Sequence, residues 1–134
     1  MKGSSDIGAI PGGQGSILET TANSGNASGT PFIKVSANAG LRGLTIDYPN
    51  QTWTGVPTVY PYAIQATGSN VYIMNIGLRA CYSGIDLFTY KCDNHYVDFV
   101  AGQIFVNGFR VGGNSTGGKI YNLHFQYHLL CQWI

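Results

Sequence analysis

The stretch NVYIMNIGLRACYSGIDLF, residues 70–88, decides the fold. It contains two short runs in which apolar residues alternate with other residues, VYIMNIGL and GIDLF, joined by a polar corner. Similar pairs of runs return later in the chain as NHYVDFVAGQIFV and GKIYNLHF. Alternation with a period of two is typical of β-strands. The question is whether these runs form a hairpin of an ordinary β-domain or one coil of a repeating structure.

The apolar positions of these runs recur at a nearly regular spacing. One set consists of Ile73, Ile76 and Leu78, which match Val97 and Val100 at an offset of 24 and Ile120, Leu123 and Phe125 at an offset of 47. Leu41, Leu44 and Ile46 precede this set by 32 residues, and the insertion QTWTGVPTVYP accounts for the excess. The other runs give a second series, Ile33/Val35, Ile64/Ala66, Ile85/Leu87 and Ile104/Val106.

A period of about 20 to 24 residues without an intervening helix predicts a solenoid, because like residues of successive coils must stack on one another. The strands of a β-sandwich have no need to resemble one another at fixed spacing. The sequence therefore predicts an all-β parallel β-helix of five to six coils. We expect a single domain over residues 1–134, in which residues 1–30 are rich in loops with at most one strand and residues 31–134 form the repeating coils.

Asparagine and cysteine carry further expectations. Asn70, Asn75, Asn94 and Asn122 stand at strand edges, where Asn accepts unusual backbone angles and can bond to neighbouring coils. Three cysteines, Cys81, Cys92 and Cys131, leave at least one unpaired within the chain. We expect small buried side chains with free thiols, with one disulfide as the alternative. The spacing of Cys81 and Cys92 fits no metal-binding motif.

The composition argues against two classes of partner. A formal net charge of +1 with no cluster of basic residues gives no expectation of nucleic-acid binding. No apolar run approaches the roughly 20 residues of a membrane-spanning helix, so we expect no membrane partner. The first residues, MKGSSDIGAIPGG, lack the apolar centre of a signal peptide.

Several runs in order, among them GLRGLTIDYPNQT, YPYAIQATGSNVYIMNIGL, YSGIDLF, NHYVDFVAG, QIFVNGF and KIYNLHF, resemble the pectate-lyase superfamily. The closest likeness is to the group related to family 28 glycoside hydrolases. The resemblance covers about residues 29–125 and implies a right-handed β-helix. Proteins of this kind usually act on polysaccharides as lyases or hydrolases, or form the shafts of phage tailspikes.

The chain also departs from the family pattern, and these departures lead to further predictions. The chain contains neither the NTD string nor the GHG string of polygalacturonase-like hydrolases. Family members run to several hundred residues and have capped ends. We therefore expect a fragment of a longer product, secreted or extracellular, or a chain that forms a homo-oligomer through uncapped coil ends.

Glycoside hydrolysis needs two carboxyl groups, so the densest group of ionisable residues is the predicted site. Alternation places Asp86 and Asp98 on the outer face, because Ile85, Leu87 and Val97 point inward. The candidate catalytic residues are Asp86, Lys91, Asp93, His95 and Asp98, and the candidate sugar-stacking residues are Tyr82, Tyr90 and Tyr96. The alternative is an ordinary polar surface. We predict no cofactor, with a Ca²⁺ site at the same aspartates as the lesser alternative.

The predicted function is that of a carbohydrate-active β-helix segment that binds or cleaves a polysaccharide on its outer face. Such a segment could also be inactive on its own. The alternative is a non-catalytic structural piece that works by assembly. The sequence leaves open whether the protein is an enzyme, and if it is, whether it acts as a hydrolase or a lyase.

Overall fold

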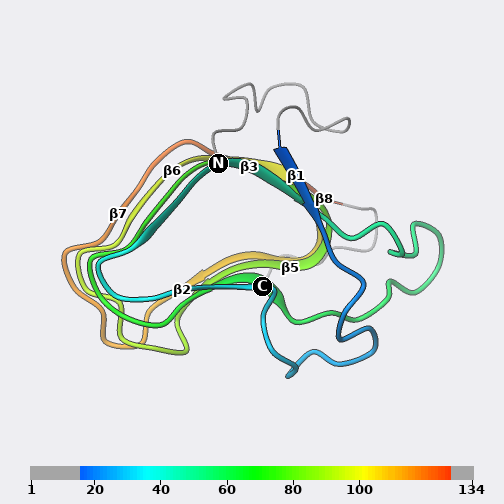
Figure 1. Ribbon diagram of the computed structural model, residues 1–134, viewed down its shortest axis with the longest axis horizontal. Coiled ribbons are helices and arrows are strands. Elements are labelled where there is room, and N and C mark those ends of the chain that lie inside the picture. The colour runs from blue at the N-terminus through cyan, green and yellow to red at the C-terminus, as the bar shows by residue number, and fades with distance from the viewer. Residues whose placement is uncertain (1–15, 128–134) are drawn as a thin grey trace.

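The computed structural model describes residues 16–127, and these residues form a stack of parallel strands with no helix among them. The strands are β1 (Ser16–Glu19), β2 (Ile33–Val35), β3 (Gly40–Asp47), β4 (Tyr62–Ala66), β5 (Tyr72–Leu87), β6 (Tyr96–Val111), β7 (Lys119–Ile120) and β8 (Leu123–Tyr127). Figure 1 looks along the stack, so that successive coils overlie one another. The protein is a parallel β-solenoid of about five turns, which confirms the predicted fold class.

Each coil contributes to three faces of the stack. The first face holds residues 40–42, 72–74, 96–98 and β7. The second face holds β1, residues 44–47, 76–79 and 100–103, and β8. The third face holds β2, β4, residues 83–87 and residues 107–111. The long strands β5 and β6 therefore each pass through all three faces of one coil, and they correspond to the paired runs seen in the sequence.

The strand register confirms the first series of matched residues and corrects the second. Ile73 pairs with Val97, which pairs with Ile120, as the spacing predicts. In the second series Ile85 pairs with Phe109, whereas Ile104 pairs with Cys81. The prediction that Ile104 matches Ile85 was therefore wrong. The consecutive apolar residues Ile104, Phe105 and Val106 run through the corner between the second and third faces, and the register shifts there, so the sequence pattern does not mark where the third face begins.

The core is built from columns of inward side chains, one from each coil. The second face supplies the column Leu18, Ile46, Leu78, Gly102 and Phe125. Ile46 and Leu78 are fully buried, and full burial of such a side chain stabilises the fold by roughly 1.5–3 kcal/mol. At Gly102 a Cβ atom would lie 2.2 Å from the carbonyl oxygen of Leu78, so the backbones of these two coils approach too closely for any side chain.

The corners are formed by residues with positive φ, largely asparagine. Asn38, Asn70 and Asn94 have φ angles of 61°, 57° and 54°. Asn70 Nδ2 donates to Asn38 Oδ1 at 2.9 Å, and Asn94 Nδ2 donates to Asn70 Oδ1 at 3.2 Å. Asn75 and Asn122 also have positive φ. Asparagine occupies these positions because its short amide tolerates the left-handed conformation and can bond to the next coil, as predicted.

The two cysteines among the described residues, Cys81 and Cys92, are buried free thiols, as predicted. Cys131 lies outside residues 16–127. Both ends of the chain, which the expectation of uncapped coil ends concerns, also lie outside this range. Within this range the structure contains no helix of the length and apolar character needed to cross a bilayer.

Two long loops, residues 20–32 and 48–61, leave the stack on the same side, between the second and third faces (Figure 1). Gln51 closes the second loop: its Oε1 accepts from the backbone N–H of Thr52 and Thr58, and its Nε2 donates to the Thr58 carbonyl. The first loop bonds to the second through Gly25 N–H and the Val59 carbonyl at 2.7 Å. The loops therefore form a fixed wall beside the third face.

Candidate functional site

A row of polar side chains crosses the third face on its outer side. Lys34 pairs with Gln65, Gln65 with Asp86, and Asp86 with Arg110, on four successive strands. Since neighbouring strands lie about 4.8 Å apart, the row spans roughly 14 Å along the axis of the stack. Alternation along the strands places these residues outside because their neighbours, including Ile64 and Ile85, are fully buried in the core.

Asp86 is the centre of this row. Its Oδ1 accepts from the backbone N–H of Phe88 at 2.9 Å and of Thr89 at 3.1 Å, and its Oδ2 accepts from the Thr89 hydroxyl at 2.5 Å and from Gln65 Nε2 at 2.9 Å. Only 1% of the residue is exposed. Burial alone would raise the pKa of Asp86, but the hydrogen bonds from Thr89, Gln65 and Phe88 outweigh it and lower the pKa below the usual 3.8.

Arg110 is fixed at one end of the row. Its Nε and Nη2 each lie 3.3 Å from Asp86 Oδ1, and Nη2 donates to the Thr89 hydroxyl at 2.8 Å. The guanidinium carbon lies 5.2 Å from the ring centroid of Tyr62 and 4.7 Å from that of Phe88. These contacts fix the plane of the guanidinium. Among the described residues no bond occupies Nη1, so two N–H donors remain for a ligand.

The row forms the floor of an open groove of about 500 Å³. The wall on one side is the first loop, residues 27–31, together with Pro61. Tyr62, Thr89 and Tyr90 line the rest, and Tyr90 is 46% exposed. The groove thus combines charged and amide groups with the exposed ring of a tyrosine, which is a combination that can bind polyhydroxylated molecules.

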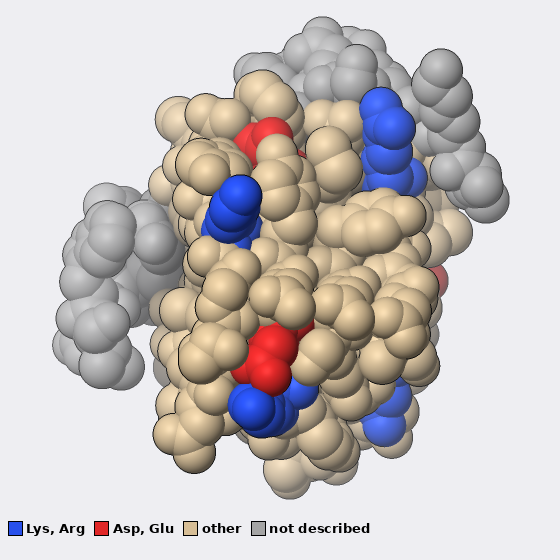
Figure 2. Space-filling view, turned by 90° about the vertical axis from the view of Figure 1, so that its left-hand side faces the viewer, with Lys and Arg blue, Asp and Glu red and all other residues tan. Residues whose placement is uncertain are grey.

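Of the predicted catalytic residues, Lys91 and Asp93 form an ion pair of their own. Lys91 Nζ lies 3.0 Å from Asp93 Oδ2, and Asp93 Oδ1 accepts from the backbone N–H of Thr116 at 2.8 Å. The bond from Lys91 is the main reason why the pKa of Asp93 is lowered. Asp93 thereby joins the corner of one coil to the next. Figure 2 faces the side of the stack on which β7 lies and shows scattered charged side chains among uncharged surface.

His95 and Asp98 lie elsewhere. The ring of His95 is buried, its Nδ1 lies 2.7 Å from the Cys92 carbonyl oxygen, and a Cβ atom at Gly118 would collide with the ring. Asp98 is on the first face, where its oxygens accept from the Tyr96 hydroxyl at 3.1 Å and from Asn122 Nδ2 at 2.8 Å. The structure therefore does not bring Asp86 and Asp98 together, because they occupy different faces.

The three predicted sugar-stacking tyrosines are also separated. Tyr90 lines the groove beside Asp86. Tyr82 is half-buried and packs against the core. Tyr96 lies on the first face with its ring centroid 5.9 Å from that of Tyr121. Only Asp86 and Tyr90 of the predicted residues therefore belong to one site.

Sequence reasoning missed Lys34, Gln65, Tyr62 and Arg110. The signal that could have found the first two was present, because the matched series that includes Ile33, Ile64 and Ile85 places the next residue of each run in one outer row. The wrong match of Ile104 to Ile85 concealed Arg110, which follows Phe109, the true partner of Ile85. Tyr62 is brought to the groove by its pairing with Ser83.

A further ionisable pair lies on the second face. Asp47 Oδ2 is 3.7 Å from Arg79 Nη1, and Glu19 precedes Asp47 in the same outer row. Burial raises the pKa of Asp47, and the nearby Arg79 only partly offsets it. Within residues 16–127, no group of three or more His, Cys, Asp and Glu side chains is placed to hold a metal ion.

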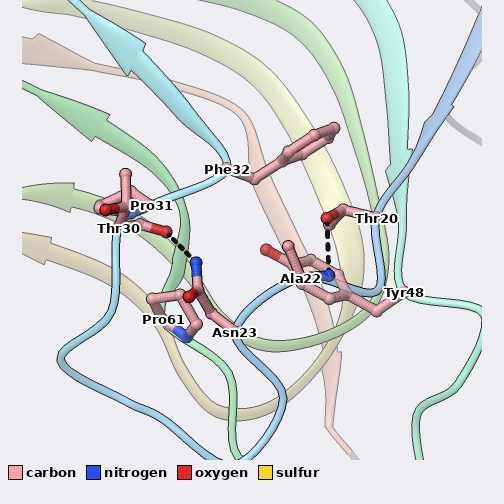
Figure 3. Close-up of a pocket in the computed structure, with 8 residues that line it drawn as sticks. All are labelled: Thr20, Ala22, Asn23, Thr30, Pro31, Phe32, Tyr48 and Pro61. Atoms are coloured by element: carbon pink, nitrogen blue, oxygen red, sulfur yellow. Dashed lines mark hydrogen bonds between the residues drawn. The ribbon is translucent and has the colours of Figure 1, made fainter.

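A smaller pocket of about 210 Å³ adjoins the groove (Figure 3). It shares Thr30, Pro31 and Pro61 with the groove wall. The remaining lining residues are Thr20, Ala22, Asn23, Phe32 and Tyr48. Figure 3 shows these residues arranged around one space between the two long loops, with Asn23 Nδ2 bonded to the Thr30 carbonyl at 2.9 Å.

Comparison of the chain with protein-family models, with curated proteins and with solved structures finds no match. The relation to the pectate-lyase superfamily accordingly stays a hypothesis, and the candidate site depends on its own geometry.

Proposed function

We propose that the protein binds a polysaccharide in the groove on the third face. The observation that carries this proposal is the row of Lys34, Gln65, Asp86 and Arg110, which lies in register across four strands and lines one groove. Such a row offers charged and amide hydrogen-bonding groups at a regular spacing, which suits a ligand that is itself a repeating polymer. The resemblance to polysaccharide-active β-helices agrees with this choice of ligand.

The chemistry of the groove favours binding over turnover. A general acid for glycoside hydrolysis has to be protonated near the working pH, and a nucleophile has to be accessible. The lowered pKa of Asp86 and the hydrogen bonds that enclose its carboxylate favour a structural role for this residue over either of these roles. We assign to Asp86 the role of holding Arg110 and Gln65, whose outward groups contact the ligand. Catalysis by Asp86, Lys91, Asp93, His95 or Asp98 stays a prediction.

Binding to a panel of immobilised polysaccharides, followed by calorimetry with soluble fragments of any ligand found, tests the proposal. Arg110→Gln removes the free guanidinium donors and is expected to weaken binding about tenfold or more, corresponding to roughly 1.4 kcal/mol. The matched control is Arg42→Gln, which makes the same change on the first face. Tyr90→Ala and Tyr72→Ala form a second pair, since these tyrosines are 46% and 49% exposed. If the two substitutions of each pair weakened binding equally, the assignment of the binding site to the groove would be refuted.

A second candidate function is assembly through the end of the stack. Val111 and Leu123 belong to inward columns of the last coils, yet they are 45% and 36% exposed. A further coil from another copy of the chain would cover them and continue the parallel sheet. Light scattering across a concentration series tests this candidate. A dimer that Leu123→Lys converts to monomer would support it, and a monomer at all concentrations would refute it.

A further inference from the structure

The charges that a ligand in the groove can reach are positive. Lys34 and Arg110 stand at the two ends of the outer row, three strand spacings or roughly 14 Å apart. Lys34 is exposed and forms no ion pair within the described part of the chain. Arg110 contacts Asp86 through Nε and Nη2, which leaves the two N–H groups of Nη1 for a ligand. Asp86 is the one carboxylate in the groove lining, and it is only 1% exposed.

The amide of Gln65, in the middle of the row, has a fixed orientation. Its Nε2 donates to Asp86 Oδ2 at 2.9 Å. An ionised carboxylate only accepts hydrogen bonds, so turning the amide round would bring two oxygen atoms together. Oε1 therefore points away from Asp86, and none of the described residues donates to it. The middle of the row thus presents an acceptor, which suits a hydroxyl group of the ligand and disfavours an anion.

Asp86 disfavours an anion at its own level of the row. Its oxygens are occupied by donors from the protein, and its negative charge repels a second anion at short range. In an extended polysaccharide one sugar unit advances about as far as the spacing between neighbouring strands. A chain with an acidic group on every unit would therefore place one of these groups against Asp86. Since the flexible side chain of Lys34 can reach the level of Gln65, one or two uncharged units fit between the two cations.

We propose that the groove binds an acidic heteropolysaccharide in which one or two uncharged sugar units separate neighbouring anionic groups. One anionic group accepts from Arg110 Nη1, the next accepts from the Lys34 ammonium, and a hydroxyl of the uncharged unit between them donates to Gln65 Oε1. The anionic group can be a carboxylate or a sulfate ester, since both accept from the same donors. The inference depends on the proposed polysaccharide binding and narrows it to one class of ligand.

Calorimetry with the full chain and matched six-unit sugars tests this inference. In a hyaluronan fragment, units with a carboxylate alternate with uncharged units. The carboxyl-reduced form of the same fragment has no charge, and hexagalacturonate has a carboxylate on every unit. The hyaluronan fragment is expected to bind about tenfold more tightly than either, because only this fragment makes both charge-assisted contacts without an anion at Asp86. A keratan sulfate fragment that is sulfated only on its N-acetylglucosamine units shows whether a sulfate ester replaces the carboxylate.

Lys34→Gln tests the row with little risk to folding, because this exposed ammonium has no partner among the described acidic residues. The variant is expected to bind the hyaluronan fragment about tenfold more weakly and with a smaller dependence on salt, while its affinity for the carboxyl-reduced fragment stays unchanged. The matched control is Lys119→Gln, which makes the same change at an exposed lysine of the first face.

The outcomes separate the two proposals. Equal binding of the hyaluronan fragment and its carboxyl-reduced form would overturn the role of the two cations and leave the groove in place. Tighter binding of hexagalacturonate would overturn the spacing of the acidic units. Equal effects of Lys34→Gln and Lys119→Gln would overturn the assignment to the row. If neither anionic heteropolymer binds but a neutral polysaccharide of the panel does, this inference alone fails. If nothing in the panel binds, the proposed function fails with it.

Discussion

Replacement of Asp86 by Asn is expected to destabilise the solenoid strongly, although the residue is on its outer side. The carboxylate accepts six hydrogen bonds, from Gln65, Phe88, Thr89 and Arg110. Asn has nearly the same shape but keeps only one acceptor oxygen, and its NH₂ group faces donors. The variant therefore loses about half of the bonds and leaves N–H groups unpaired.

The magnitude follows from the kind of bond that is lost. A hydrogen bond to a charged group contributes roughly 1.5–3 kcal/mol, and bonds within one network are not additive. We discount the contribution of Arg110, whose side chain is 42% exposed to solvent. The loss of two bonds from Gln65, Thr89 or the backbone gives a decrease of about 3 kcal/mol in the free energy of unfolding.

Urea unfolding followed by circular dichroism at several pH values measures this effect. Because the folded-state pKa of Asp86 lies below its ordinary value of 3.8, the carboxylate stabilises the fold fully above that value. The difference between wild type and Asp86→Asn should be constant from pH 7 to about pH 5 and should shrink as pH falls through the folded-state pKa. A difference below about 0.5 kcal/mol at pH 7 would refute the reasoning. Asp93→Asn is the comparison and should have a smaller effect, because this carboxylate is 24% exposed and accepts only from Lys91 and Thr116.

Three further predictions concern stability and reactivity. Gly102→Ala should lower the free energy of unfolding by about 1–3 kcal/mol or prevent folding, because the added Cβ would lie 2.2 Å from the Leu78 carbonyl oxygen. Urea unfolding measures this effect, and a variant as stable as the wild type would contradict it. Phe99→Asn should raise the free energy of unfolding by about 0.5–1 kcal/mol in the same assay, because Phe99 has a φ of 52°, which asparagine tolerates better, and its ring is 47% exposed. A loss of stability would show that the ring makes a needed contact. In a Cys131→Ser variant, Cys81 and Cys92 should react with Ellman's reagent only on unfolding, because both are fully buried and burial raises the pKa of each thiol; fast reaction in the folded state would disprove this.

The candidate site was predictable only in part. Alternation along GIDLF correctly placed Asp86 outside and Ile85 and Leu87 inside. Nearness in sequence, however, grouped Asp86 with Asp93 and Asp98, which the coil carries to a corner and to another face. The side chains of neighbouring coils that adjoin Asp86 are those of Gln65 and Arg110, 21 and 24 positions away. In a solenoid the neighbours of a side chain lie one period away, so clusters in the sequence are a poor guide to clusters in space.

The sequence by itself determined the repeat. Stacked coils require like residues at like positions, so the columns that contain Ile73, Val97 and Ile120 leave a period that can be read directly. The corner asparagines were determined in the same way, because few residues other than glycine and asparagine adopt positive φ at low cost. Only the tertiary structure decided where each coil turns from the second face to the third, because in β6 an unbroken apolar run, Ile104 to Val106, passes through that corner. It also decided that two loops far apart in the chain enclose the groove and the Tyr48 pocket, since loop conformation depends on individual contacts such as those of Gln51 and Asn23 that no periodic pattern encodes.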